Sequence, residues 1–347
     1  MQQLILAALL SAAVTILLGP VIIPLLKRLK FGQTERNDGP RSHLAKQGTP
    51  TMGGIIFLTG LTAGTLVFTV SGSEFAIPAL LITFAFSLVG FLDDFIKVKL
   101  KRSLGLKAYQ KIIGQFGIAL IVALYCYYGG LNDINWNDLS QSTNVLIGSK
   151  IYLPFWDVEL ELGLLYIPFA MFVIIGAVNS VNLTDGLDGL ASGVTMIYSV
   201  SMSLIFLFIS NELGQAGKVY QSAAASGMII FAGSVAGACL GFLRFNSFPA
   251  RVFMGDTGSL ALGGAIAVMA LFSRAVLLLP VMGACFVASA VSVILQVGSY
   301  KLRKKRIFRM APLHHHFELK GVAETRIVSV YMIITAVLCL ICLLAYA

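Results

Sequence analysis

The chain has 347 residues, of which 57% are hydrophobic and only 12% are charged. A soluble domain carries roughly twice that share of charged residues, so the composition excludes an ordinary soluble protein. Apolar runs of about 20 residues recur, and this length crosses a bilayer as a helix. We therefore predict an all-α integral membrane protein that forms a single polytopic membrane domain over 1–347. The net charge of +9 would suit nucleic acid, but the basic residues flank the apolar runs, so we expect membrane lipids as partners and no nucleic acid.

Ten apolar segments are predicted to span the membrane. They cover 3–26, 52–70, 76–96, 110–128, 164–181, 190–210, 222–242, 258–272, 277–299 and 326–346. No basic stretch precedes the first segment, which argues against a cleaved signal peptide. Ten spans place both termini on one side of the membrane.

The basic residues orient this topology. Of the 25 Lys and Arg residues, 22 fall on one side, in the loops 27–50, 97–111, 243–253 and 300–326. The positive-inside rule makes this side cytoplasmic, so we expect both termini to be periplasmic or extracellular. The segment 129–163 is then external, and its alternating residues favour a small hairpin or interfacial segment. The five cysteines lie within or at the ends of apolar runs and predict no disulfide framework.

Lys46 precedes a group of threonines and glycines at the start of the second apolar run. An ammonium group beside hydroxyl groups and glycines is suited to a diphosphate, although no GxxxxGK[ST] motif occurs. The third run ends in Asp93 and Asp94. Adjacent carboxylates repel each other, so a cation is expected nearby, and Mg²⁺ prefers such oxygen ligands. The alternative is a solvated helix end with ion pairs to Lys97 or Lys101.

The stretch between the fifth and sixth runs carries Asn182, Asp185 and Asp188 at a spacing of three. On a helix this spacing places the side chains on one face. Charged groups that persist at membrane depth usually serve a site. The alternative is an ordinary polar turn in which Asp188 caps the next helix.

Asp256 lies between two glycines just before the eighth run, with Asn246 upstream. It is either a metal-binding carboxylate on a tight turn, with Asn246 nearby, or a helix N-cap. The last basic loop ends in the consecutive histidines His314, His315 and His316. Consecutive residues of a helix point in different directions, so we do not expect one metal to bind all three. Hydrogen bonds to phosphate or sugar, or proton transfer, suit them better.

Carboxylates for Mg²⁺ and cations for phosphate thus meet at one membrane face. This combination predicts phosphoryl transfer with a membrane-resident substrate. The acids cluster at span ends, which disfavours the alternative of an ion-coupled transporter, because that class places its charges near mid-span.

The chain also resembles the phospho-N-acetylmuramoyl-pentapeptide transferases, within the superfamily of polyprenyl-phosphate N-acetylhexosamine-1-phosphate transferases. The resemblance rests on motifs distributed from residue 46 to residue 318. They are 46–54 (KQGTPTMGG), 90–94 (GFLDD), 182–190 (NLTDGLDGL), 253–260 (FMGDTGSL) and 312–318 (PLHHHFE). The acidic motifs are typical of the superfamily, and the triple histidine followed by Phe-Glu is similar to the muramoyl-pentapeptide branch. A sister N-acetylglucosamine-1-phosphate transferase, with a different histidine loop, is the nearest alternative.

The resemblance implies a Mg²⁺-dependent transfer from UDP-N-acetylmuramoyl-pentapeptide to undecaprenyl phosphate, giving lipid I and UMP. It also implies ten transmembrane helices, a homodimer in the bacterial inner membrane and a cytoplasmic-face active site. Asp256 matches the metal ligand, and Asp93, beside Asp94, matches the base or nucleophile. The remaining matches are catalytic His314 and the substrate-binding residues Lys46, Lys111, Asn182, Asp185, Asp188, Asn246, Phe253, Gln296, His315 and His316.

Overall fold

The structure is a computed structural model that describes residues 1–29, 46, 48–69, 73–100, 105–132 and 148–346. Lys101, and Trp136 in the predicted external segment, lie outside the described residues.

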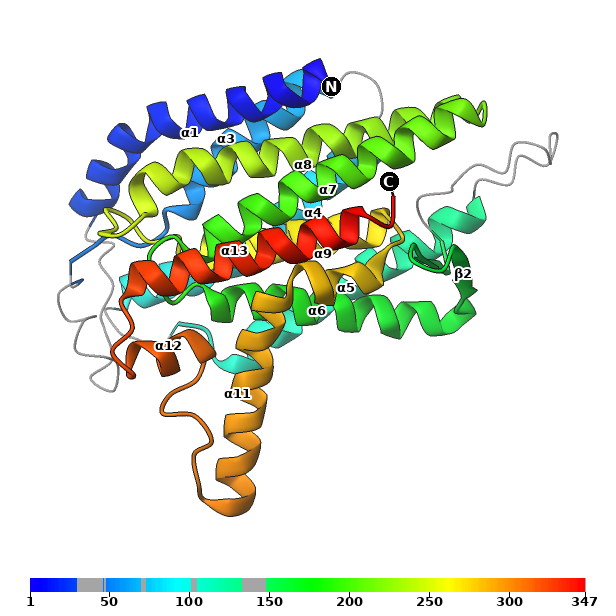
Figure 1. Cartoon of the computed structure of the whole chain (residues 1–347). Helices are drawn as coiled ribbons and strands as arrows, with labels where there is room; N and C mark the ends of the chain where they lie inside the picture. Colours follow the sequence, from blue (N-terminus) through cyan, green and yellow to red (C-terminus); the bar gives the residue numbers. More distant parts are fainter. Residues whose placement is uncertain (30–45, 47, 70–72, 101–104, 133–147, 347) are drawn as a thin grey trace.

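Ten helices of the described residues overlap the ten predicted apolar segments (Figure 1). They are α1 (Gln2–Arg28), α3 (Gly54–Phe68), α4 (Ser73–Lys99), α5 (Ala108–Asn132), α6 (Tyr166–Thr184), α7 (Leu190–Gln215), α8 (Val219–Asn246), α9 (Gly255–Phe272), α11 (Ala284–Arg303) and α13 (Glu324–Leu343). Within the described residues, nine of them are long and apolar enough to cross a membrane. The tenth, α3, has 15 residues, or about 22 Å of helix, which is shorter than a hydrocarbon core of about 30 Å. The prediction of an all-α integral membrane protein is confirmed.

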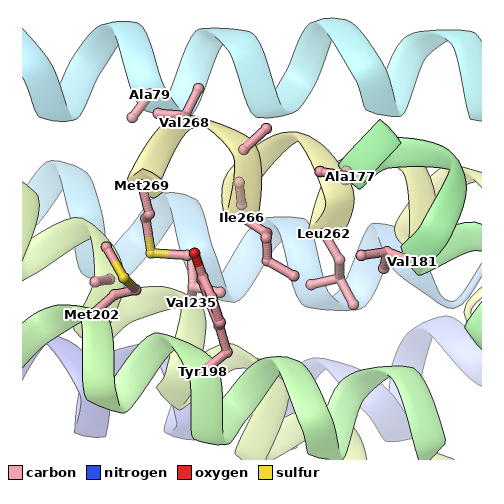
Figure 2. Packing of buried hydrophobic residues seen from close by; sticks show 14 of the residues in the cluster. Ala79, Ala177, Val181, Tyr198, Met202, Val235, Leu262, Ile266, Val268 and Met269 are labelled. Carbon is pink, nitrogen blue, oxygen red and sulfur yellow. The ribbon is translucent and has the colours of Figure 1, made fainter. Parts of the chain in front are cut away.

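Helix α9 lies at the centre of the bundle, and its residues from Thr257 to Phe272 are all buried. Figure 2 shows its side chains packed among α4, α6, α7 and α8. A helix that is apolar all round is stable where neighbouring helices or lipid cover it, and neighbouring helices cover α9. Any polar group that α9 carries at its first turn is therefore held at a fixed place in the bundle.

Two glycines allow α3 and α4 to approach the start of α9 at backbone distance. A side chain at Gly54 of α3 would overlap the backbone of Gly258, and one at Gly90 of α4 would overlap the backbone of Asp256. Only glycine, which lacks a Cβ atom, permits such contacts. These contacts bring the C-terminal end of α4, with Asp93 and Asp94, beside the first turn of α9.

The predicted span 277–299 is wrong as a single helix. The chain forms a short 3-10 turn, η2 (Val276–Leu278), and a four-residue helix, α10 (Leu279–Met282), before α11 begins. Pro280 lies at the start of α10, and the amide of Gly283 closes that turn on the carbonyl of Leu279. Proline has no amide hydrogen, so a helix tends to begin there rather than continue through it. In Figure 1, α11 leaves the bundle at a steep angle, and α12 (Leu313–Glu318) returns toward it.

The described part of 129–163 contains two short antiparallel strands, β1 (Lys150–Leu153) and β2 (Val158–Glu161). A 3-10 turn, η1 (Gly163–Leu165), leads from β2 into α6, whereas 129–132 belong to α5. The external location of this hairpin stays a prediction.

Candidate active site

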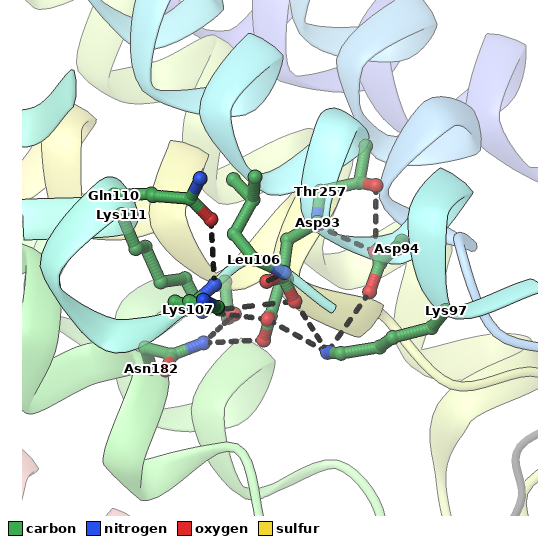
Figure 3. Close-up of polar contacts among 11 residues, drawn as sticks. Asp93, Asp94, Lys97, Leu106, Lys107, Gln110, Lys111, Asn182 and Thr257 are labelled. Carbon is green, nitrogen blue, oxygen red and sulfur yellow. Dashed lines mark hydrogen bonds and ion pairs between the residues drawn. The ribbon is translucent and has the colours of Figure 1, made fainter. Parts of the chain in front are cut away.

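Three carboxylates from two helices form the centre of the site, and we call them the carboxylate cluster. They belong to Asp93 and Asp94 near the end of α4, which are labelled in Figure 3, and to Asp256 in the first turn of α9. One oxygen of each lies within 4.8 Å of the others. Asp256 is not an N-cap, because that position belongs to Met254 and no side chain caps α9. The N-cap interpretation of Asp256 was therefore wrong.

Hydrogen bonds from outside α4 fix the two adjacent aspartates. The Thr257 amide and hydroxyl donate to Asp94 Oδ2 at 2.9 and 2.7 Å. The Leu106 amide donates to Asp93 Oδ1 at 2.8 Å, and Gly105 lies directly against the Asp93 carboxylate. Both aspartates are 2% exposed. Their positions therefore depend on a loop and a helix that come from other parts of the sequence.

Two lysines join the cluster. Lys97 Nζ lies 2.6 Å from Asp93 Oδ2, 3.5 Å from Asp94 Oδ1 and 2.9 Å from Asp256 Oδ2. Lys111 Nζ lies 2.7 Å from Asp256 Oδ2. The sequence predicted Lys97 only as a partner of the adjacent aspartates. Its contact with Asp256 could not be predicted, because the two residues lie far apart in the sequence. Three carboxylates face two ammonium groups, which leaves one negative charge uncompensated.

Asn182 also belongs to this cluster, because its amide donates to Asp256 Oδ1 at 2.8 Å and to Ser259 Oγ at 2.7 Å. The prediction that Asn182, Asp185 and Asp188 share one helix face is wrong. Helix α6 ends at Thr184, and the chain turns through the following residues before α7. A turn, unlike a helix, sends side chains at a spacing of three to different partners.

Asp188 takes part in a second cluster with Lys46 and Glu324. Lys46 Nζ lies 2.7 Å from Asp188 Oδ1 and 2.7 Å from Glu324 Oε1. Asp188 Oδ2 accepts from the Ala250 amide at 2.9 Å. The N-cap interpretation of Asp188 is wrong, because Gly189 holds the cap position of α7. Burial lowers the pKa of Lys46, but the bonds to the two carboxylates outweigh it and raise that pKa overall.

Asn246 lies in this second region and not with Asp256, as its position in the sequence had suggested. It accepts from the Gly189 amide at 3.2 Å and from Ser192 Oγ at 3.0 Å, and it donates to the Val252 carbonyl at 3.1 Å. The next residue, Phe253, exchanges backbone hydrogen bonds with the segment that follows Lys46. These contacts join three segments next to the site: the turn before α7, the loop after α8 and the segment that follows Lys46.

The three histidines divide into a pair and a single residue. His314 and His315 have ring centroids 4.3 Å apart, and a side chain at Gly186 would collide with His314 Nε2 and lie in tight contact with His315 Nε2. His315 Nδ1 lies 2.7 Å from Glu318 Oε2. His316 accepts from the Arg309 amide at 3.1 Å instead. The separation agrees with the expectation that no single metal takes all three imidazoles.

Gln296 on α11 is engaged by the basic loop. Its side-chain amide donates to the Phe308 carbonyl at 2.9 Å, and its Oε1 accepts from the amides of Ile307 and Phe308 at 3.0 and 2.9 Å. These bonds close the loop against α11, so Gln296 shapes the segment that leads to the histidines. Glu324, Ser259 and Leu106 are site neighbours that the sequence did not indicate, since each comes from a distant element.

Asp185 occupies the turn between Asn182 and the histidine pair. Burial, and after it the charges of Asp256, Asp94 and Asp188, raise the pKa of its carboxyl group to about 8. The protonated form of Asp185 is therefore favoured at neutral pH. A protonated carboxyl group can donate a hydrogen bond to a ligand as well as accept one.

The carboxylate cluster has the composition that a divalent cation requires. Mg²⁺ binds hard oxygen ligands and is usually held by one or two carboxylates together with phosphate oxygens of a substrate. The uncompensated negative charge favours a cation here. The Asp256 side chain is 17% exposed, whereas the Asp93 and Asp94 side chains are 4% and 2% exposed, so Asp256 is the most accessible ligand.

Comparison with known proteins identifies the family of this chain. The chain is 47% identical to the phospho-N-acetylmuramoyl-pentapeptide-transferase of Clostridioides difficile over 343 residues, which cover 99% of this chain and 98% of the relative. It is 46% identical to the namesake of Desulfitobacterium hafniense, with the same coverage, and 48% identical to that of Heliobacterium modesticaldum, with 95% and 94% covered. The chain belongs to the phospho-N-acetylmuramoyl-pentapeptide-transferase family.

Two family models agree with this membership. The model for glycosyl transferase family 4 matches residues 76–274, which include the whole carboxylate cluster. The first signature of the phospho-N-acetylmuramoyl-pentapeptide-transferases matches residues 46–58, from Lys46 into α3. The resemblance noted in the sequence is confirmed, and the chain is a phospho-sugar transferase of the membrane.

The raised pKa of Asp185 predicts a specific dependence of stability on pH. The folded pKa of about 8 lies above the ordinary value of 3.8. The stabilisation from the protonated form is therefore complete below the ordinary pKa and is lost as the pH rises through the folded value. The melting temperature of the wild type relative to Asp185→Asn should fall as pH rises from about 5 to about 9. Glu212→Gln, which removes an exposed carboxylate at the other end of α7, is the matched control. A difference that stays constant across this range would contradict the assignment.

Proposed function

We propose that this chain transfers phospho-N-acetylmuramoyl-pentapeptide from its UDP conjugate to undecaprenyl phosphate, forming lipid I and UMP. The observation that supports this most directly is the carboxylate cluster with Lys97 and Lys111, located where membrane helices end. Such a site can serve an ionic nucleotide from the aqueous side and a phosphate carried by a lipid from the membrane side. The relatives' shared name gives the same reaction class.

We propose Mg²⁺ as the cofactor, with Asp256 as its protein ligand. Bound there, the ion would neutralise charge on the diphosphate of the nucleotide substrate. Asp256 is held for this task by Asn182 and Lys111, which bind different oxygens of its carboxylate. Lys97 contacts all three carboxylates in this structure. A cation bound there would neutralise their charge in its place, and the ammonium group of Lys97 could then turn to a phosphate.

Asp93 is proposed as the group that accepts the remaining proton of the lipid phosphate. An oxygen of that phosphate then forms a bond to the sugar-bearing phosphorus, and the bond from this phosphorus to the UMP oxygen breaks. A phosphate monoester has a second pKa of about 6, so much of it is already ionised at neutral pH. A base therefore contributes modestly here, about 10²–10⁴-fold. Asp94, whose Oδ2 is occupied by Thr257, keeps the local charge and geometry.

The nucleotide-sugar is proposed to contact Asn182, Asp185, His314 and His315. Gly186 lies against both imidazoles and follows Asp185 directly, so these groups line one turn of the chain. His316 is proposed to bind substrate at the rim. Substrate binding is also proposed for the residues that the sequence resemblance suggested, in addition to the loop contacts described above: Lys46, Asp188, Asn246, Phe253 and Gln296.

The decisive test of the function is a substrate comparison. Purified protein with Mg²⁺ and undecaprenyl phosphate should release UMP from UDP-N-acetylmuramoyl-pentapeptide and not from UDP-N-acetylglucosamine. Initial rates of UMP release measure the difference. Turnover of UDP-N-acetylglucosamine alone would identify the sister transferase instead.

The roles of Asp256 and Asp93 predict different responses to Mg²⁺. Asp256→Asn should raise the Mg²⁺ concentration that gives the half-maximal rate, or abolish activity. Asp93→Asn should leave the Mg²⁺ midpoint in place, lower the rate by about 10²–10⁴-fold and flatten the acidic limb of the pH–rate profile. Initial UMP release against Mg²⁺ and pH measures both effects. A shifted midpoint in Asp93→Asn together with an unshifted one in active Asp256→Asn would overturn the assignment.

We also propose that the site faces the cytoplasm of a bacterial cell, with both termini outside the inner membrane. Lys107 lies beside the carboxylate cluster and Gln215 ends α7, and both are exposed, whereas all five cysteines are buried. Lys107→Cys should react with a membrane-impermeant thiol reagent only in inside-out vesicles, and Gln215→Cys only in intact spheroplasts. The reverse pattern would refute the orientation. A homodimer is proposed as well, and light scattering of the purified protein tests it.

A further inference from the structure

The β1–β2 hairpin presents an exposed apolar edge and an aromatic tip. Phe155 and Trp156 form the tip, are 49% and 72% exposed, and contact each other edge to face at 6.4 Å. Val158 and Leu160 of β2 are both 48% exposed. Their neighbours in the strand, Glu159 and Glu161, point to the opposite face, because side chains alternate along a strand. The hairpin is thus amphipathic, with an aromatic tip.

The acidic face of the hairpin is clamped to the loop that follows α9. Glu159 Oε1 lies 2.8 Å from Arg274 Nη2, and the Tyr152 amide donates to the Arg274 carbonyl at 2.9 Å. Ile151, which pairs with Leu160, is 3% exposed. Ile151 lies on the same face of the hairpin as Leu160, because directly opposed residues of an antiparallel pair share one face. The hairpin is therefore fixed to the bundle through Ile151 of β1 and through Glu159, while Val158 and Leu160 of β2 stay uncovered within the described part of the chain.

The apolar edge continues into a membrane-spanning surface. Leu164 and Leu165 of η1 are each 71% exposed, and Phe172, two turns into α6, is 76% exposed. Helix α6 is one of the spans. An exposed apolar face on a spanning helix contacts lipid, and the hairpin edge extends this face beyond the first residue of the helix. Such continuity, together with a tryptophan at the end of the span, is the pattern of the interfacial aromatic belt.

The hairpin also stands at a defined place relative to the site. It joins the first turn of α6 and the loop after α9, and the opposite ends of these helices carry Asn182 and Asp256, which bind each other at 2.8 Å. The 19 residues of α6 measure about 28 Å, close to the thickness of the hydrocarbon core. The hairpin and the carboxylate cluster therefore lie near opposite membrane surfaces.

We propose that the tip and apolar edge of the hairpin, formed by Phe155, Trp156, Val158, Leu160 and Leu164, lie in the phospholipid interface opposite the active site. There they act as an anchor that fixes the depth of α6 and α9 in the bilayer. The partner is the interfacial layer of phospholipid headgroups and the first acyl carbons. The indole ring suits this layer because it combines a large apolar surface with one N–H donor. This inference depends on the spanning helices and not on the proposed reaction.

Tryptophan fluorescence in vesicles tests the anchor directly. The chain has two tryptophans, so Trp136→Phe leaves Trp156 as the single probe. The protein is reconstituted into phosphatidylcholine vesicles with or without bromine atoms on the upper acyl carbons, and iodide is the aqueous quencher. A matched control places the probe on the acidic face of the same strand, as Glu161→Trp in the Trp136→Phe, Trp156→Phe background.

If the anchor is correct, brominated lipid quenches the fluorescence of Trp156 at least about twofold more strongly than that of the probe at position 161. Iodide then quenches the probe at position 161 more strongly than Trp156. Retained circular dichroism and an unchanged melting temperature confirm that each variant is folded. Equal quenching of the two probes by brominated lipid would overturn the proposal. So would a Trp156 that is shielded from both quenchers, because a second protein copy would then cover the edge in place of lipid.

Discussion

Sharing of two lysine ammonium groups among three carboxylates, two buried and one half-buried, is the interaction on which the rest of the site depends. Like charges a few ångströms apart repel strongly where water is scarce. Asp93, Asp94 and Asp256 remain together because Lys97 bridges all three and Lys111 neutralises Asp256 from another helix. The packing of α4, α5 and α9 is thereby linked to the charge balance of the site. A charged substrate or a metal ion that binds here must therefore replace some of the ion pairs between the lysines and the carboxylates.

The bundle supports this balance through backbone contact. Gly54 and Gly90 let α3 and α4 touch the first turn of α9, and the burial of the rest of α9 keeps that turn from sliding. The short length of α3 is consistent with this arrangement, since its start is fixed against Gly258. The geometry of the polar site therefore depends on the packing of the apolar core, because displacing α9 would separate Asp256 from its partners.

The polar residues at the same membrane level serve two different purposes. The carboxylate cluster gathers charge that is suited to phosphoryl transfer. The second group, Lys46 with Asp188 and Glu324, holds loops from three parts of the chain in register, and its ammonium group is already paired with two carboxylates. Between them, Asp185 and the imidazoles of His314 and His315 surround Gly186. The carboxylate cluster and the group around Lys46 are thus adjacent but differ in their charges and partners.

The sequence by itself determined the membrane helices, because a bilayer imposes length and hydrophobicity on each span separately. It also indicated which residues to propose for the chemistry, since aspartates and histidines at the ends of apolar runs are costly without a role. Tertiary structure alone decided the partners. Lys97 reaches Asp256 across 159 positions, and Lys46 reaches Glu324 across 278. Local patterns also misled: the spacing of Asn182, Asp185 and Asp188 suggested a helix face, but α6 ends at Thr184 and sends them to different partners. Helix ends and long-range ion pairs depend on packing between distant segments, which no local pattern encodes.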